Sequence, residues 1–505
     1  RRRRTYRSVP RRVGSAGWAL VEPPGMGTLA DDTRWMDATA QADLVANGEA
    51  SPRELVDAAI DRIEADDGPV NAVVVRWFEH AREVAGGALP EGPFRGVPFL
   101  LKDLYAHYEG QVLTNGNVAL RDAQPISQGD TTLVSRFRAA GLVTLGRTNS
   151  PELGSVPVTE PVAYGPTRNP WDLDRTPGGS SGGAGAAVAA GMVPVSHASD
   201  GGGSIRIPAS CCGLVGLKTS QGRITLGPQR TESGLSVELC VSRSVRDTAR
   251  LLDAVDGPGV GDTVIAPAPR RPYADEVGAD PGRLRIGLLD VHPRGGSLHD
   301  DCVEAVRRAA GLLESLGHDV EIGFPAPLSD DSFTPRFMSI WATMMVLGLD
   351  VYADALGRPL TEEEVEPVNR AQAQFAGSLS AVDYANSLAA VAEYRRATQQ
   401  WWADGWDLLL SPTLAEPPVR VGELDPRPDD PLAGMRRAAE WVPFTPPFNT
   451  TGQPAVNVPL HWNADGVPVG VQLASAYGRE DVLIQVASQL EEASPWADRR
   501  PPTGN

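Results

Sequence analysis

The chain has 505 residues, of which 41% are hydrophobic and 22% are charged, so it can bury a large core as an ordinary globular protein. Its formal net charge of -18 argues against a nucleic-acid partner, which favours a basic surface, and against docking on anionic lipid. No apolar run reaches the roughly 18 residues that a membrane-spanning helix needs.

Apolar patterns typical of helices and strands alternate along the chain. Continuous apolar strands between helices are typical of an α/β/α domain, with a central twisted mixed, largely parallel sheet covered by helices on both faces. The elements expected in chain order are helix 51–67, strand 94–106 ending near Lys102, helix then strand across 131–149, helix 182–191, extended run 192–199, strand-like 204–208, helix 243–257, strand 283–290, helix 300–318, strand 319–324, helical region 330–405, strands 406–414, 454–460 and 468–476, and helix 479–493.

The N-terminal segment and two proline-rich segments are expected to lie outside the regular helices and strands. Residues 1–30 are arginine-rich and contain Met26, which favours a disordered tail or an upstream-extended gene start over a targeting peptide. We expect the fold to begin near Asp31. The proline-rich segments 265–282 and 415–431 are expected to be surface loops.

Cysteine and histidine usage gives no sign of a metal site. The four cysteines, Cys211, Cys212, Cys240 and Cys302, form no C-x-x-C pair, and the seven histidines form no H-x-x-x-H pair. We therefore expect free buried thiols, a cytoplasmic protein and no metal site.

Two serine-and-glycine clusters stand out at Ser180 and Ser204. The segment GGSSG (178–182) matches the G-x-S-x-G nucleophile elbow, but the preceding DLDRTPGG is not a strand, which the elbow requires. A dinucleotide-binding loop is also disfavoured, because strict G-x-G-x-x-G spacing is missing. Around Ser204 the run GGGS lacks side chains that would block a ligand from the backbone N–H groups, so it predicts an oxyanion-binding nest rather than a merely flexible turn.

The segment between the two serines allows them to meet. Nine helical residues advance about 14 Å, and the six or seven extended residues that follow return about 20 Å. The chain can therefore leave along a helix and come back along a strand. The positive end of that helix also points toward Ser180.

Lys102 is the better candidate for the base that such serines need. Of the 46 basic residues only Lys102 and Lys218 are lysines, and a buried lysine can lose its proton, whereas arginine cannot. Lys218 could compete for this role, although anchoring the backbone suits its place better. His197, the nearest histidine to Ser204, is expected to be structural because its strand position turns it elsewhere.

Together these segments resemble the amidase signature family. The signature is GGSSGGAGAAVAAGMVPVSHASDGGGSIRIPASCCGLVGLKTS (178–220), preceded by GVPFLLKD (96–103), and it is long and specific. The resemblance extends over residues 34 to 500 and includes GRTNSPELG, TRNPWD and FNTTGQPAVNVPL. Within the family, WWADGWDLLLSPT and GVQLASAYGREDVLIQVASQLE are most similar to 6-aminohexanoate cyclic-dimer hydrolases, amidases that open a nylon-related cyclic diamide.

The resemblance implies an amidase domain over residues 31–500, with a signature core at 94–260 and a variable substrate-shaping region at 330–440. It implies that Ser204 is the nucleophile, that Ser180 bridges to it after a cis peptide at Gly179–Ser180, and that Lys102 is the base. The oxyanion would be held by the backbone amides of Gly201, Gly202, Gly203 and Ser204. The implied partners are a small amide substrate and water, with no cofactor, and a homodimer is expected.

Two other functions stay open at this point. A glutaminase-like amidotransferase subunit would deliver ammonia to a companion chain, and a non-catalytic binding protein on an amidase scaffold would lack a member of the triad. All three triad positions are occupied here by the expected residue types, Lys102, Ser180 and Ser204. Gly201 and Gly202 stand where members often carry Thr-Gly before the nucleophile, and Thr219 and Ser220 stand where Pro-Thr is common. Neither departure touches the triad.

Overall fold

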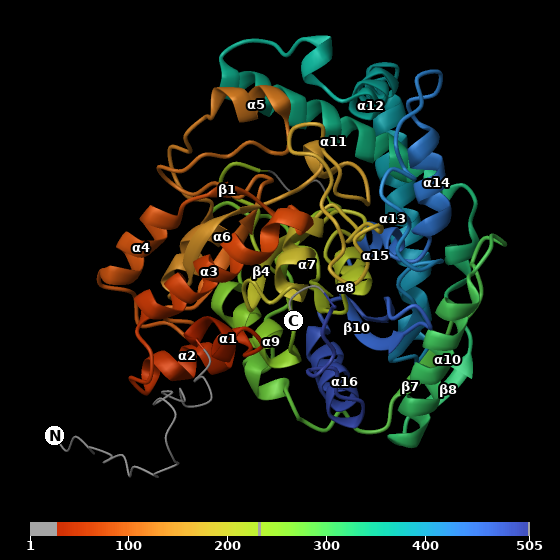
Figure 1. The fold of residues 1–505 in the computed structure, drawn as a ribbon. Coiled ribbons are helices and arrows are strands. Elements are labelled where there is room, and N and C mark those ends of the chain that lie inside the picture. Colours follow the sequence, from red (N-terminus) through yellow and green to blue (C-terminus); the bar gives the residue numbers. More distant parts are fainter. Residues whose placement is uncertain (1–27, 231–233, 503–505) are drawn as a thin grey trace, which may run out of the picture.

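One mixed sheet runs through the computed structural model, which describes residues 28–230 and 234–502 (Figure 1). Within those residues the sheet has eleven strands in the order β1-β3-β2-β4-β6-β5-β10-β11-β9-β7-β8. The strands are β1 (Val73–Arg76), β2 (Pro98–Lys102), β3 (Val143–Thr148), β4 (Val195–Asp200), β5 (Val215–Lys218), β6 (Val237–Ser242), β7 (Arg285–Leu288), β8 (Asp319–Ile322), β9 (Leu408–Pro412), β10 (Ala455–Trp462) and β11 (Pro468–Ser475).

The pairing of these strands corrects one feature of the expected sheet. Parallel ladders join β2 to β3 and β4, and β7 to β8 and β9, whereas every other neighbouring pair is antiparallel. The sheet is therefore mixed, as expected, but not largely parallel. The reason is that β10 and β11 form a hairpin, and that β5 and β6 enter the sheet antiparallel to their neighbours.

Helices pack on this sheet and confirm the α/β class. Helices α7 and α8 pack on its central strands, while α9, α10 and α16 contact strands from β5 to β11. The helices are α1 (Leu29–Thr33), α2 (Ala38–Ala46), α3 (Pro52–Val70), α4 (Phe78–Gly86), α5 (Val118–Ala123), α6 (Thr132–Ala139), α7 (Gly182–Ala189), α8 (Arg206–Cys212), α9 (Val245–Val255), α10 (Asp300–Ser315), α11 (Phe333–Leu356), α12 (Pro367–Gly377), α13 (Ala381–Ala403), α14 (Ala433–Trp441), α15 (Pro446–Thr451) and α16 (Glu480–Ala493).

Most local patterns fold as expected. Ser51 caps α3 and forms a capping box with Glu54, and β2 ends at Lys102. Of the expected N-terminal extension, residues 1–30, positions 1–27 with Met26 lie outside the described residues. The described chain begins with Thr28, which caps α1.

The strand expected at residues 204–208 is wrong. The chain turns at Ile205 into α8, whose residues are all buried. Pro208 is tolerated because it lies in the first helical turn, where backbone N–H groups have no partner within the helix. Burial and the contacts of Arg206 outweigh the strand preference of the two isoleucines.

Helix α11 forms a roof beside α12 and α13, away from the sheet (Figure 1). Its length and composition would also allow it to span a membrane, but one such helix is weak evidence, since core helices pass the same test. Gly348 lets α11 lie close to the layer beneath it. A Cβ at that position would lie 2.5 Å from Cδ2 of Leu153 and 2.7 Å from Oη of Tyr105.

Candidate active site

Lys102 ends β2 with its side chain fully buried. Its Nζ donates to Oγ of Ser180 at 2.7 Å and to Oγ of Ser199 at 3.0 Å. Burial lowers the pKa of Lys102 to about 7, although the carboxylates of Glu238 and Asp200 act in the opposite direction. A large share of this amine is therefore neutral near pH 7 and able to accept a proton.

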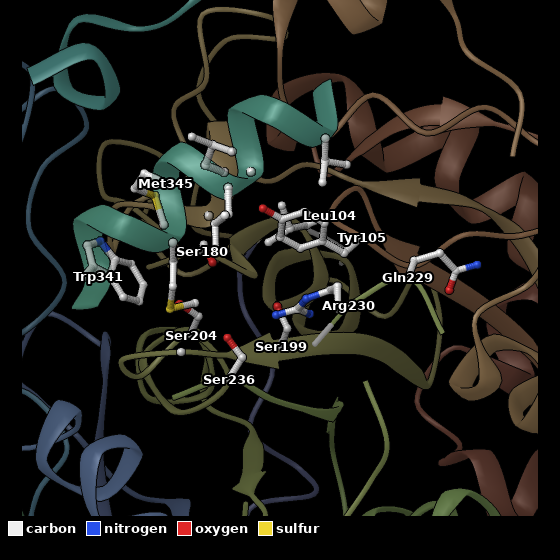
Figure 2. Close-up of a pocket in the computed structure, with 17 residues that line it drawn as sticks. Leu104, Tyr105, Ser180, Ser199, Ser204, Gln229, Arg230, Ser236, Trp341 and Met345 are labelled. Carbon is white, nitrogen blue, oxygen red and sulfur yellow. The ribbon is translucent and has the colours of Figure 1, made fainter. Parts of the chain in front are cut away.

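Ser180 lies in the loop that leads into α7, and the peptide bond between Gly179 and Ser180 is cis, as the resemblance implied. Ser181, the next residue, ties this loop to β4. Its Oγ donates to the backbone oxygen of Ser199 at 3.2 Å and accepts from the Ser199 N–H at 3.3 Å. The chain leaves along α7 and returns along β4, and the predicted meeting of Ser180 and Ser204 in one cavity is observed (Figure 2).

Ser204 lies in the turn between β4 and α8 and is 7% exposed. The predicted nest in front of it is only partly free, because the Gly203 N–H donates to Oδ1 of Asp200 at 2.7 Å. Among the described residues, the amides of Gly201, Gly202 and Ser204 have no hydrogen-bond partner. We therefore narrow the expected oxyanion donors to those three.

Glycine is required at position 203 for two reasons. Its φ of +139° lies in a region that side chains disfavour. A Cβ would also lie 2.3 Å from Oγ1 of Thr445, which donates to the backbone oxygen of Gly202 at 2.7 Å. The turn before Ser204 therefore has a geometry that no other residue at this position would keep.

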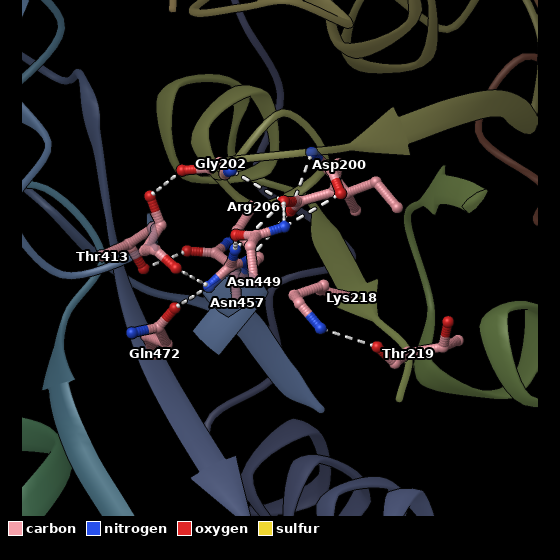
Figure 3. Close-up of polar contacts among 12 residues, drawn as sticks. Asp200, Gly202, Arg206, Lys218, Thr219, Thr413, Asn449, Asn457 and Gln472 are labelled. Carbon is pink, nitrogen blue, oxygen red and sulfur yellow. Dashed lines mark hydrogen bonds and ion pairs between the residues drawn. The ribbon is translucent and has the colours of Figure 1, made fainter. Parts of the chain in front are cut away.

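A buried polar network lies beneath this turn (Figure 3). The carboxylate of Asp200 accepts from Nε and Nη2 of Arg206 at 2.9 and 3.0 Å, and from the Ile205 N–H at 3.2 Å. Arg206 in turn donates to side-chain oxygens of Asn449 and Gln472, each at 2.7 Å. Burial alone would raise the pKa of Asp200, but Arg206 outweighs it and lowers the pKa to about 2. The network thus holds the nucleophile turn with a fixed charge pair.

The other two candidate bases, Lys218 and His197, contact groups outside the proposed relay. Nζ of Lys218 donates to the backbone oxygens of Thr219 and Gln453, both at 2.8 Å, which agrees with an anchoring role. Burial lowers the pKa of Lys218 also to about 7, so the pKa alone does not identify the base. His197 accepts from the Lys102 N–H at 3.3 Å and lies 2.9 Å from Oε2 of Glu238.

Sequence reasoning missed three residues around Lys102. Ser199 is one of the two hydroxyl partners of Lys102, and its position two residues after His197 on β4 was the only local sign that it shares that face. Glu238 pairs with Arg230, whose guanidinium lies 4.6 Å from the ring centre of Tyr105. These two come from a distant segment, so no local pattern could place them.

Two cavities meet at Ser204. The first has a volume of about 150 Å³ and is lined by Ser180, Ser199, Tyr105 and Arg230. The second has a volume of about 110 Å³ and a mostly apolar lining. Its distinctive residues are Ile207, Arg294, Phe333, Phe337, Met338, Met435, Ala438 and Val442. Gly154, Ser204 and Trp341 line both, so a substrate held at Ser204 has space on two sides.

The predicted free thiols are observed, since all four cysteines are buried and unpaired. Among the described residues, no group of three or more His, Cys, Asp or Glu side chains could hold a metal ion. The expectation that no cofactor is used stays a prediction.

Comparisons with known proteins agree with this geometry. The Amidase family profile matches residues 54–484. The 6-aminohexanoate-cyclic-dimer hydrolase of Paenarthrobacter ureafaciens is 44% identical over 477 residues, covering 92% of this chain and 96% of the relative. A solved 6-aminohexanoate cyclic dimer hydrolase complexed with substrate superposes with a TM-score of 0.90 at 43% identity, covering 94% of this chain and all of that one. A bacterial aryl acylamidase superposes with a TM-score of 0.84 at 29% identity, covering 93% and 98% of the two chains.

Proposed function

We propose that this chain, which belongs to the amidase signature family and is a hydrolase acting on carbon–nitrogen bonds, cleaves carboxylic amides through an acyl-enzyme on Ser204. One observation carries the proposal. A buried lysine, Lys102, lies 2.7 Å from Oγ of Ser180 in the cavity that Ser204 also lines. Nucleophilic catalysis needs a hydroxyl within reach of a base, and this arrangement supplies the base through a second hydroxyl.

The proposed first half-reaction transfers protons along one relay. Neutral Lys102 accepts the proton of Ser180 while Ser180 accepts that of Ser204, and Ser204 Oγ attacks the carbonyl carbon. The amides of Gly201, Gly202 and Ser204 stabilise the oxyanion, and removing one such donor typically costs about 3 kcal/mol of transition-state stabilisation. The relay then returns a proton to the nitrogen, the carbon–nitrogen bond breaks, and the amine leaves.

In the second half-reaction water replaces the amine. The same relay accepts a proton from water, which attacks the ester carbon of the acyl-enzyme, and Ser204 leaves with its proton restored. Lys102 therefore alternates between neutral and protonated forms in each half-reaction. A pKa of about 7 suits both directions of this transfer.

The substrate that we propose is 6-aminohexanoate cyclic dimer or a related linear amide. The support is the 44% identity to the hydrolase of that name and the cavities on both sides of Ser204. We further propose a cytoplasmic homodimer. Gel filtration with light scattering measures the oligomeric state.

The test combines variants with a substrate panel. Ser204→Ala should abolish both hydrolysis and labelling by a fluorophosphonate, and Lys102→Ala should strongly impair both. Full activity of Lys102→Ala would refute the relay. The panel compares short aliphatic amides, aryl amides, glutamine and the cyclic dimer. Ammonia release from glutamine that requires a copurifying chain would favour an amidotransferase subunit instead.

A further inference from the structure

The two cavities that meet at Ser204 differ in their access to the proton relay. Ser180, which must deliver the proton to the leaving nitrogen, lines the first cavity and is not among the residues that line the second. If amide cleavage follows the proposed mechanism, on which this inference rests, the leaving amine must lie in the first cavity. The acyl group, on the other side of the carbonyl carbon, then extends into the second cavity, which we call the acyl chamber.

The lining of the acyl chamber is mostly apolar and includes one charged side chain. Phe333, Phe337 and Met338 of α11 lie on one side, and Ile207 of α8 lies near Ser204. Such a surface suits a chain of methylene groups, because burying each one contributes favourable free energy. An acyl group with an alkyl chain therefore fits the chamber.

The one charge is the guanidinium of Arg294, in the loop after β7. It is half-buried, and within the described part of the chain it has neither an ion-pair partner nor a side-chain hydrogen bond. Burial lowers the pKa of Arg294, while Tyr394 and Asp331 act in the opposite direction. Asp331 is nevertheless too far from Arg294 to form an ion pair. By contrast Arg230, in the first cavity, is paired with Glu238.

A partly desolvated cation without an ion-pair partner, in a mostly apolar chamber, favours an anionic ligand group, because a charge-assisted hydrogen bond would replace its lost hydration. We propose that Arg294 is a specificity-determining residue that binds a carboxylate at the far end of the acyl group. The preferred substrates are then amides of dicarboxylic acids in which the second carboxylate is free. An acyl group ending in an ammonium, such as that of a linear 6-aminohexanoyl amide, is disfavoured by the same charge. The inference therefore narrows the proposed linear substrates to amides whose acyl group ends in a carboxylate, while the neutral cyclic dimer has no charged end for Arg294 to attract or repel.

The experiment uses three series of 4-nitroanilides and follows the release of 4-nitroaniline by the full chain. The acyl groups are alkyl chains of matched length that end in a carboxylate, a methyl group or an ammonium. The dicarboxylic members are the mono-anilides of succinic, glutaric, adipic and suberic acid. The wild-type protein and the variants Arg294→Gln, Arg294→Lys and Arg336→Gln are compared by kcat/KM. Arg336 is the matched control, because it lies on α11, is partly exposed, and lines neither cavity.

The expected readout is a ratio, which cancels general damage to the enzyme. In Arg294→Gln the ratio of kcat/KM for the carboxylate member to that for the methyl member should fall about tenfold or more. Cleavage of the ammonium member should improve relative to the methyl member. Arg294→Lys should keep most of the carboxylate preference, and Arg336→Gln should leave all ratios unchanged. The methyl member reports whether each variant is folded.

Equal ratios in the wild type and in Arg294→Gln would overturn the inference while leaving the amidase function intact. The same holds if Arg336→Gln lowers the ratio as much as Arg294→Gln, because that would show a general surface-charge effect. Failure of the wild type to cleave any amide, including those of the panel above, would instead refute the proposed function itself. If Arg294→Gln does not fold, a wild-type protein that cleaves the carboxylate member no faster than the methyl member, with a ratio that does not fall at high salt, overturns the inference.

Discussion

Replacing Glu238 by glutamine should move the acid limb of the pH–rate profile to lower pH. In the proposed mechanism only neutral Lys102 accepts a proton, so kcat/KM rises as the pH passes through the pKa of Lys102. The carboxylate of Glu238 favours the protonated form and raises that pKa against the effect of burial. The substitution removes this negative charge and leaves the positive charge of Arg230 unpaired, and both effects lower the pKa of Lys102.

The magnitude follows from the pKa of about 7 for Lys102, against 10.5 for an ordinary lysine. The gap is equivalent to about 5 kcal/mol between the two protonation states. At pH 7 about half of Lys102 is neutral, whereas an ordinary lysine would be neutral in about one molecule in three thousand. We expect Glu238→Gln to shift the limb by about one pH unit.

The assay is kcat/KM for a neutral 4-nitroanilide from about pH 5 to about pH 10, which reports groups of the free enzyme. Lys218→Met is the matched control, because burial also lowers the pKa of Lys218 to about 7, yet its Nζ contacts only backbone oxygens. The reasoning is refuted if the limb stays in place in Glu238→Gln, or if Lys218→Met moves it.

Three further predictions concern the groups around the nucleophile turn. The folded pKa of Lys218 lies below its unfolded value of 10.5, so the unfolded chain binds the extra proton between about pH 7 and 10.5, and stability due to this group rises with pH there. When the free energy of unfolding is measured by urea unfolding at several pH values, its increase with pH in that window should be smaller in Lys218→Met than in the wild type by about 1.4 kcal/mol per pH unit. An equal increase in both proteins would contradict the assigned pKa. Asp200→Asn leaves Arg206 buried without its counter-ion and should cost about 3–5 kcal/mol of unfolding free energy, whereas a loss within about 1 kcal/mol would show that the pair is not needed. Gly203→Ala forces a Cβ against Thr445 and should abolish fluorophosphonate labelling of a protein that still folds by circular dichroism; normal labelling would show that the turn tolerates a side chain.

The sequence predicts the chemistry better than the architecture around it. Lys102 can be found because lysine is so rare in this chain, and its place at the end of a buried strand suits a base. Helix and strand lengths predict only that Ser180 and Ser204 can meet, because this depends on the local rise per residue. Their roles as bridging serine and nucleophile come from the family resemblance. Local signals thus locate residues whose role depends on residue type.

The errors arise where distant segments decide the outcome. Residues 204–208 look like a strand, yet Arg206 binds Asp200 and Asn449 and the segment becomes helix α8. The Gly203 amide looks like an oxyanion donor, yet its N–H donates a hydrogen bond to the carboxylate of Asp200. Glu238, which raises the pKa of Lys102, lies 136 positions after it in the chain, and no local sequence pattern indicates its role. Such contacts follow only from the assembled sheet.

The contact at Gly348 also bears on how the substrate range of this fold could change. The hydrogen at its Cα lets α11 lie against Leu153 and Tyr105, and a single added methyl group there would require the ends of these two side chains, or the helix, to shift. Because Leu153 and Tyr105 line the first cavity, a larger side chain at this position would rearrange the lining of that cavity. The proton relay, built on β2, β4 and the start of α7, would stay in place beneath. In this arrangement, mutations in α11 can change the lining of the cavities without replacing any residue of the relay.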